Sequence, residues 1–320
     1  MDIGIGFWIA FHVFILGMLA LDLGVFQKRA HVVTKKEALI WTLVWVVFAL
    51  LFDLGIHLKY GSEKSLEFLT GYLIEKALSV DNLFVFLVIF SSFAVPPASQ
   101  RIVLLWGLLG ALVMRAAFIL AGAALLKRFH WLMYVLGAFL VYTGVRLVTK
   151  EEEPMEPGHH PVVRLVRRVL PVWSKYEEER FFVFRQEKWM ATPLLVVLAV
   201  VECTDLVFAL DSIPAIFAIT MDPFLVYTSN VFAILGLRAL YFLLAGAMSQ
   251  FRFMKEGLAA VLAFVGVKML LNDVFHLPIK FSLGFIAAAL TLAVVASMKF
   301  PAAPGAGHAP DDEGPRDPDP

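Results

Sequence analysis

Cysteine is almost missing from this 320-residue chain, in which Cys203 is the single example. One cysteine excludes an intrachain disulfide and any metal site built from clustered cysteines. Net charge is missing too, because 27 basic residues balance 27 acidic ones, so there is no bulk electrostatic attraction to nucleic acid. The N-terminus lacks the basic start of a signal peptide, and no small-residue cleavage site follows its apolar run. The first segment is therefore expected to be a retained membrane span.

Apolar residues are abundant instead. They make up 60% of the chain, and charged residues 17%, whereas a soluble domain has about 45–50% and about 25%. A membrane span needs roughly 20 mostly apolar residues. The sequence therefore predicts an all-α polytopic membrane protein with about nine transmembrane helices, at about 4–26, 38–57, 68–95, 101–126, 131–149, 192–219, 224–248, 257–275 and 280–299.

Polar segments interrupt and follow these runs. Residues 150–191 form an insert rich in Glu, Arg and Pro, and residues 300–320 form an acidic, Pro-rich tail that we expect to be disordered. Lys and Arg favour cytoplasmic connections. They are concentrated in the first connection and in the insert, and the outside connections hold only Lys59, Lys64, Lys127, Arg128 and Lys280. The bias predicts an outside N-terminus, a cytoplasmic insert and a cytoplasmic C-terminus.

Two stretches place carboxylates inside apolar runs, "EKALSVDNLFVF" from Glu75 and "DLVFALDSIPAI" from Asp205. An ionisable residue at bilayer depth costs about 2.5–3.5 kcal/mol on insertion scales, so it indicates a functional site. The six-residue spacing is shared: Glu75 and Asp81 in the first stretch match Asp205 and Asp211 in the second. Asn82 and Ser212 then occupy equivalent positions.

The likeness continues downstream and predicts an internal repeat. It aligns Arg115 with Arg238, and Arg146 with Lys268. Residues 1–57 would hold two N-terminal spans, and the repeat units would be 66–149 and 192–275, before a last span at 280–299. Because each unit has three spans, the second enters the membrane from the opposite side, as in many transporters whose site lies at the midplane between the repeats.

Helix geometry constrains such a site. At about 100° per residue, Glu75, Ser79 and Asn82 share one face, whereas Asp81 points about 120° away. Pro214 predicts a helix break near Asp211 that would free backbone carbonyls beside the acids. Carboxylate and carbonyl oxygens suit a hard divalent cation, and protonation of the acids when the metal leaves would couple transport to protons.

Structural roles are the alternative for each polar residue. Glu75 and Asp205 could pair with Arg238 and Arg115 simply to fasten helices together. Glu202, whose aligned partner is Tyr72, is a further ligand candidate or a supporting base. Asp22 and His12 in the first span are weaker candidates, and a lone histidine on an apolar face is more often hydrogen-bonded structure than a ligand.

The blocks "GYLIEKALSVDNLFVFLVIFSSFAVP", "LLWGLLGALVMRAAFILAGAALL" and "VECTDLVFALDSIPAIFAIT" resemble the signature blocks of the TerC family, including its Alx-type members. The resemblance covers about residues 7–275. It implies an integral protein of the bacterial inner (plasma) membrane, in the LysE-type transporter superfamily, associated with manganese efflux and named for tellurium resistance. The family's acidic membrane residues correspond to Glu75, Asp81, Asn82, Glu202, Asp205 and Asp211.

Three functions remain open at this stage. The first is transport of a divalent cation, Mn2+ by the resemblance, through metal ligands at Glu75, Asp81, Asn82, Glu202, Asp205, Asp211 and Ser212, with no prosthetic group. The second is a membrane-protein assembly or scaffold factor that docks partners on the insert. The third is tellurite handling, which would depend on Arg115 or Arg238. An enzyme is not expected, because no nucleophile–base pair or phosphate loop is present.

Overall fold

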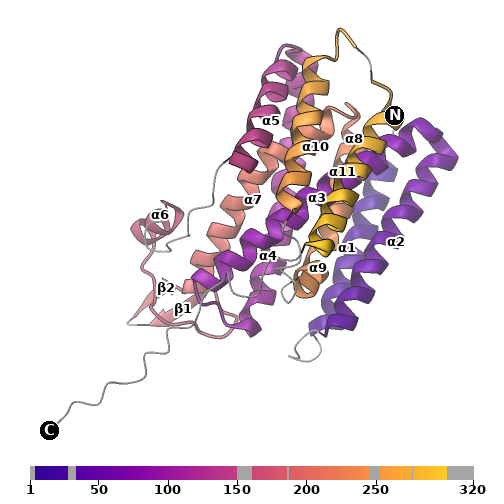
Figure 1. Cartoon of the computed structure of the whole chain (residues 1–320). Helices are drawn as coiled ribbons and strands as arrows, with labels where there is room; N and C mark the ends of the chain where they lie inside the picture. Colours follow the sequence, from indigo (N-terminus) through magenta and orange to yellow (C-terminus); the bar gives the residue numbers. More distant parts are fainter. Residues whose placement is uncertain are drawn as a thin grey trace.

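The computed structural model describes residues 4–27, 34–149, 161–185, 187–244, 253–275 and 277–300. The side chains of residues 21–27, 35, 81, 84 and 244 lie outside this description. The tail that we predict to be disordered, and most of the first connection, also fall outside it. Long helices packed side by side make up most of the described part of the chain (Figure 1).

The elements follow one another as α1 (Ile5–Gln27), α2 (Lys35–Tyr60), α3 (Ser62–Ser92), α4 (Pro97–Arg128), α5 (Leu132–Thr149), α6 (Pro161–Val169), β1 (Phe182–Arg185), β2 (Lys188–Ala191), α7 (Pro193–Phe217), α8 (Pro223–Leu235), α9 (Leu237–Leu244), α10 (Met254–Leu270) and α11 (Ile279–Lys299). A helix, or a pair of helices in the case of α8 and α9, lies at each of the nine predicted spans.

Within the described residues, six helical segments are long and apolar enough to cross a membrane: 36–60, 97–128, 132–149, 193–217, 223–243 and 279–299. The chain is therefore a polytopic membrane protein. The α1 segment has a shorter apolar stretch, α10 has 17 residues, and α3 carries several charged residues. The count of nine spans stays a prediction.

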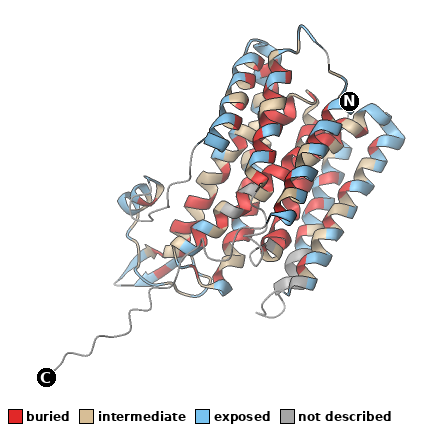
Figure 2. Cartoon of the chain, in the orientation of Figure 1, coloured by how far each residue is buried: buried red, intermediate tan, exposed pale blue. Residues whose placement is uncertain are grey.

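Burial follows the arrangement of the helices. Figure 2 shows buried residues concentrated in the interior helices, whereas the outer faces of α1 and α2 are mostly exposed. The exposed side chains of α2 include Leu43, Leu50 and Leu54. A wide exposed apolar surface of this kind marks a region that contacts lipid.

Turn chemistry brings the site helices together. Gly61 alone connects α2 to α3, with a φ of 90° that favours glycine, so the two helices run back alongside each other. At the start of α8, the Asp222 carboxylate accepts hydrogen bonds from the backbone N–H groups of Phe224 (2.9 Å) and Leu225 (3.4 Å). This is an N-cap, followed by Pro223 at the first helical position.

Small residues hold α5 against α10. A Cβ atom added at Gly266 would lie 2.6 Å from the carbonyl oxygen of Gly137, and one added at Gly144 would lie 2.8 Å from the carbonyl oxygen of Ala259. The backbones of the two helices therefore touch, as small residues permit in membrane helix pairs.

The predicted break near Asp211 is wrong. The helix α7 continues through Pro214 and ends at Phe217, one turn later. A proline so close to the end removes a single hydrogen bond, and the remaining helical bonds still satisfy the backbone. The break lies in the next span instead, at Gly236 between α8 and α9.

The insert contains local structure that the all-α expectation missed. After α6, strands β1 and β2 form an antiparallel hairpin with Phe184 opposite Trp189. The insert is fastened to the turn between α3 and α4: the Tyr176 hydroxyl donates to the Phe93 carbonyl at 2.7 Å, and Arg101 forms an ion pair with Glu179. Burial raises the pKa of Tyr176 above its ordinary value, which keeps this hydroxyl protonated as a donor. Two short apolar, aromatic-rich runs, 181–184 and 189–191, separated by the four polar residues 185–188, were the available signal.

Candidate functional site

Arg115 lies at the centre of a buried network of polar side chains. It projects from the middle of α4 and is 1% exposed. Its guanidinium forms ion pairs with the carboxylate of Glu75 from α3 and that of Asp205 from α7. Toward Asp205 it presents two donors, with Nη2 at 3.0 Å from Oδ1 and Nε at 3.4 Å from Oδ2. Two acids far apart in the sequence therefore share one cation.

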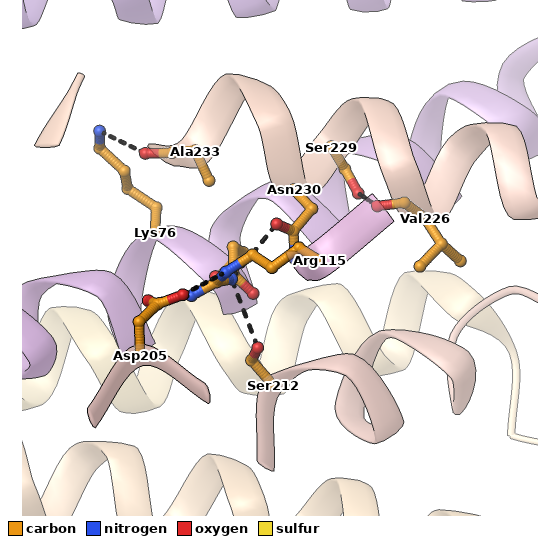
Figure 3. A network of polar contacts seen from close by, with 9 residues as sticks. Lys76, Arg115, Asp205, Ser212, Val226, Ser229, Asn230 and Ala233 are labelled. Atoms are coloured by element: carbon orange, nitrogen blue, oxygen red, sulfur yellow. Dashed lines mark hydrogen bonds and ion pairs between the residues drawn. The ribbon is translucent and has the colours of Figure 1, made fainter. Parts of the chain in front are cut away.

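Two neutral groups complete the network. Arg115 Nη1 donates to Asn230 Oδ1 of α8 at 3.2 Å and lies 3.5 Å from Ser212 Oγ of α7. Figure 3 shows these contacts as dashed lines that converge on Arg115. Four helices thus meet at one guanidinium, away from solvent, where charged hydrogen bonds are strong and an unpaired charge is costly.

Hydrogen-bonding capacity is left over around the same point. Among the described side chains, Glu75 Oε2, Asn230 Nδ2 and Ser79 Oγ are buried and have no hydrogen-bond partner. Glu75 and Asn230 both bind Arg115, and Ser79 lies one helical turn beyond Glu75. Buried polar atoms are paired in most proteins, so this group leaves a place for a water, a proton or a cation.

The formal charges point the same way. If both carboxylates are ionised, Glu75 and Asp205 together exceed the charge of Arg115 by one negative unit. Arg238, which is buried near Asp205, contributes a compensating positive charge, and a proton or another cation would act in the same sense, as low-dielectric surroundings favour.

A cavity of about 20 Å³ adjoins Asp205. Arg238 lines it, together with apolar side chains such as Phe86, Leu104 and Leu237. A volume of about 10–15 Å³ admits one water. Arg238 is buried at this cavity. Glu75 and Asp205 both form their ion pairs with Arg115. The alternative in which Glu75 pairs with Arg238 is therefore not the arrangement observed.

Among the described side chains, none of the other predicted ligands hydrogen-bonds to Arg115. Asp211 is partly exposed and accepts a hydrogen bond from Thr143 of α5 at 3.0 Å. Glu202 presses its carboxylate against Gly110 of α4, where a Cβ atom would lie 2.0 Å from Oε1, and its Oε2 is buried without a partner among the described groups. Asn82 is buried on α3. Asp81 lies on α3, and its side chain is outside the described residues.

No ready-made metal site is present in the described part of the chain, because no group of three or more His, Cys, Asp or Glu side chains lies close enough to hold an ion. The structure brings together Glu75, Asp205 and Ser212, and it places Asp211 elsewhere. As it stands, the network is a buried set of two carboxylates that share one guanidinium.

Lys76 and Thr143 are polar contributors that the sequence reasoning did not single out. The Lys76 ammonium donates to the Ala233 carbonyl at 3.2 Å and lies beside Gly236, so it stabilises the broken end of α8 (Figure 3). Its position next to Glu75 in an apolar run was the available signal. His12 has a structural role, since its ring nitrogens lie 3.0 Å from the Tyr227 hydroxyl and 2.8 Å from the Trp8 carbonyl. The Asp22 side chain is outside the description.

These features define a helical integral membrane protein with a buried ion-pair network among its helices. The family model "Integral membrane protein TerC family" matches residues 60–303, and the chain belongs to this family.

Several curated proteins are similar over nearly their whole length. "Uncharacterized membrane protein STKORF319" of Myxococcus xanthus is 52% identical, over 92% of this chain and 92% of its own. "Putative membrane-bound redox modulator Alx" is 48% identical in Salmonella typhi and 47% in Escherichia coli K12, each over 90% of this chain and 92% of its own. No solved structure matches.

Proposed function

We propose that the chain transports a divalent metal cation, Mn2+ in the first place, out of the cytoplasm across the bacterial inner membrane. The observation that carries the proposal is the network around Arg115, where two buried carboxylates share one guanidinium and neighbouring polar atoms remain unpartnered. An intramembrane ionisable cluster of this kind marks an ion or proton pathway.

In this proposal Arg115 acts as a competitor for the transported cation. With the guanidinium bound to Glu75 and Asp205, the carboxylates are occupied. An entering divalent cation would displace the guanidinium and gain carboxylate, amide and hydroxyl oxygens from Glu75, Asp205, Asn230 and Ser212, which are ligands that Mn2+ accepts. Asp81 and Asp211 would receive the ion on either side of this point. Proton uptake by the acids after release would couple metal efflux to proton entry.

We also infer that residues 66–149 and 192–275 are inverted repeats of three helices. Helix contacts occur in the pairs that a twofold axis would relate. In the alignment, α7 corresponds to α3, α8 and α9 together to α4, and α10 to α5. The contact of α3 with α8 therefore corresponds to that of α7 with α4, and both are present. The contact of α5 with α7 corresponds to that of α10 with α3, and both are again present. Such an arrangement supplies two related halves whose rocking would expose the site to each side in turn.

The glycine contacts support the same symmetry. The alignment that matches Arg146 with Lys268 also matches Gly144 with Gly266 and position 137 with position 259. The close backbone approaches join residue 137 to residue 266 and residue 144 to residue 259. When each residue is replaced by its aligned partner, the first contact becomes the second, as a twofold axis would require.

The alternatives receive less support from the site. A tellurite oxyanion would need a cationic group able to bind it, and the Arg115 guanidinium is already engaged by two carboxylates. The relatives named "redox modulator" suggest thiol–disulfide chemistry as another alternative. Such chemistry within one chain would need two thiols, and this chain has Cys203 alone. An effect on redox state would then arise through the metal that is moved.

The test is metal flux into vesicles that contain the purified protein. We expect Mn2+ uptake, read by an internal fluorescent chelator, to fall at least tenfold in Glu75→Gln and Asp205→Asn, and to fall in Asp81→Asn and Asp211→Asn. Glu63→Gln is the matched control, because Glu63 lies on the same helix but is exposed. An external pH change that accompanies uptake would report proton exchange.

Equal flux in the wild type and in the Glu75 and Asp205 variants would overturn the transport proposal. If those variants also retained full thermal stability, the two acids would serve neither in transport nor in holding the helices together. If they transported normally but lost stability, the network would be a helix fastener, and the membrane-protein assembly function would become the leading hypothesis.

A further inference from the structure

The β1–β2 hairpin exposes aromatic rings on one face. Phe182, Phe184 and Trp189 are 48%, 59% and 67% exposed. The register explains the sidedness: Phe184 is opposite Trp189, with ring centroids 5.6 Å apart, whereas Val183 and Met190 are opposite each other on the more buried face. Three large exposed rings on eight strand residues are costly in water, so this face is expected to have a partner.

The hairpin continues a surface that already faces lipid. Phe181, just before β1, contacts Trp106 of α4 edge-on at 6.4 Å between centroids. Trp106 is itself exposed and lies within a helix that is long and apolar enough to span the membrane. Trp and other amphipathic rings gather at the level of the lipid headgroups. Phe181 shares the more buried side of the hairpin with Val183, so this side packs against α4 at its lipid boundary, and the aromatic face lies on the side away from α4.

The short helix α6 adds positive charge nearby. It packs on α7 through its apolar side, where Val163 is buried. Its outer side exposes Arg164, Arg167 and Arg168 among the apolar Leu165 and Val169. In Figure 1, α6 and the hairpin both lie beside α7, outside the bundle of long helices. Guanidinium groups bind phosphate oxygens in pairs, and anionic headgroups attract basic segments at the membrane surface.

Two acidic residues in the described part of the insert are paired away from α6. Glu177 forms an ion pair with Arg185 at 3.2 Å, and Glu179 pairs with Arg101 of α4. Both acids are thus paired with residues outside α6, and the pair of Glu179 with Arg101 also fastens the insert to α4.

We propose that α6 and the hairpin form an interfacial element (residues 161–191) that lies in the headgroup layer and binds anionic phospholipid. The aromatic face enters the boundary between headgroups and acyl chains, and the three α6 arginines hold lipid phosphates. The proposal is independent of whether the protein transports a metal. It gives the insert a lipid as its partner, in place of a soluble protein.

The first test measures the depth of the hairpin in the full-length protein, reconstituted in vesicles of phosphatidylcholine with 30% phosphatidylglycerol. In a Cys203→Ala background, a nitroxide is attached in turn at Phe184→Cys, Trp189→Cys and Lys188→Cys. We expect oxygen to relax the labels at 184 and 189 more than a water-soluble nickel chelate does. The label at 188, on the opposite face of the same hairpin, should show the reverse. Nickel access at 184 and 189 equal to that at 188 would overturn the proposal and leave the face open to a soluble partner.

The second test addresses the charge of the lipid. The triple variant Arg164→Gln, Arg167→Gln and Arg168→Gln should retain at least twofold fewer phosphatidylglycerol molecules in native mass spectrometry than the wild type. Its matched control removes three basic charges elsewhere on the chain, with Lys127→Gln, Arg128→Gln and Lys280→Gln. Equal phosphatidylglycerol retention in the two triple variants would contradict specific binding at α6.

Discussion

Two helix interfaces of this protein are built in opposite ways. The charged interface joins α3, α4, α7 and α8 through Arg115 and the side chains bound to it, namely Glu75, Asp205, Ser212 and Asn230. The glycine interface joins α5 to α10 through backbone contact at Gly137, Gly144 and Gly266. The charged interface places ions at a depth where each is costly, and the glycine interface brings the two backbones into direct contact.

The difference separates framework from function. The glycine contacts follow the twofold relation of the proposed repeats, whereas the charged contacts do not. Arg115 holds both acids, while Arg238, its counterpart in the alignment, lines the cavity beside Asp205. If the proposed transport is correct, a symmetric frame around an asymmetric site is what one end state of an alternating transporter would have.

The largest expected effect comes from breaking the charged interface at its centre. Removing one partner of a buried ion pair leaves an uncompensated charge and costs about 3–5 kcal/mol. We therefore expect Arg115→Ala to lose most of its folded protein, measured as yield and as Tm in detergent by differential scanning fluorimetry.

The control for that experiment is a rescue. The triple variant Arg115→Ala, Glu75→Gln and Asp205→Asn removes the whole charge set, and we expect it to recover most of the Tm while remaining inactive in flux. If the triple variant were as unstable as Arg115→Ala, then packing of the arginine, and not its charge, would hold the interface together.

Much of the fold follows from sequence because the bilayer imposes simple rules. Apolar run length located every long helix, since a spanning segment must satisfy its own backbone. Charged residues inside membrane-length apolar runs drew attention to Glu75, Asp205 and Arg115 before their neighbours were known.

The pairing of those groups could not be predicted in the same way. The sequence allowed Glu75 to meet either arginine, and only the packing of α3 on α4 and α7 decides for Arg115. The position of the helix break was missed because a proline near a helix end is tolerated. The interruption at Gly236 is a single residue with near-helical backbone angles, beside the Lys76 ammonium that donates to the Ala233 carbonyl, and such a short interruption leaves no strong sequence signal. The hairpin was missed because its strands have four residues each.

A smaller effect should come from the glycine interface. In Gly266→Ala the new Cβ atom would lie 2.6 Å from the Gly137 carbonyl oxygen, so the two backbones must separate. Overpacking of this kind costs about 1–3 kcal/mol. We expect a lower Tm with an unchanged KM for Mn2+, because the charged interface is not touched. Gly284→Ala is the control, since nothing lies within 4 Å of its added Cβ atom. Equal Tm values for the two variants would mean that α5 and α10 are free to move apart.

The smallest effect should come from Lys76, whose ammonium bonds a single backbone carbonyl in place of a carboxylate. Interhelical hydrogen bonds in membranes contribute about 0.6 kcal/mol on average and up to about 1.7. Lys76→Met keeps the length of the side chain and loses the bond to Ala233, so we expect a Tm only slightly below that of the wild type. Lys299→Met, an exposed lysine at the end of α11, should leave the Tm unchanged. A loss in Lys76→Met as large as in Arg115→Ala would show that Lys76 belongs to the charge balance of the charged interface, and that the ammonium compensates Glu75 or Asp205 from a distance.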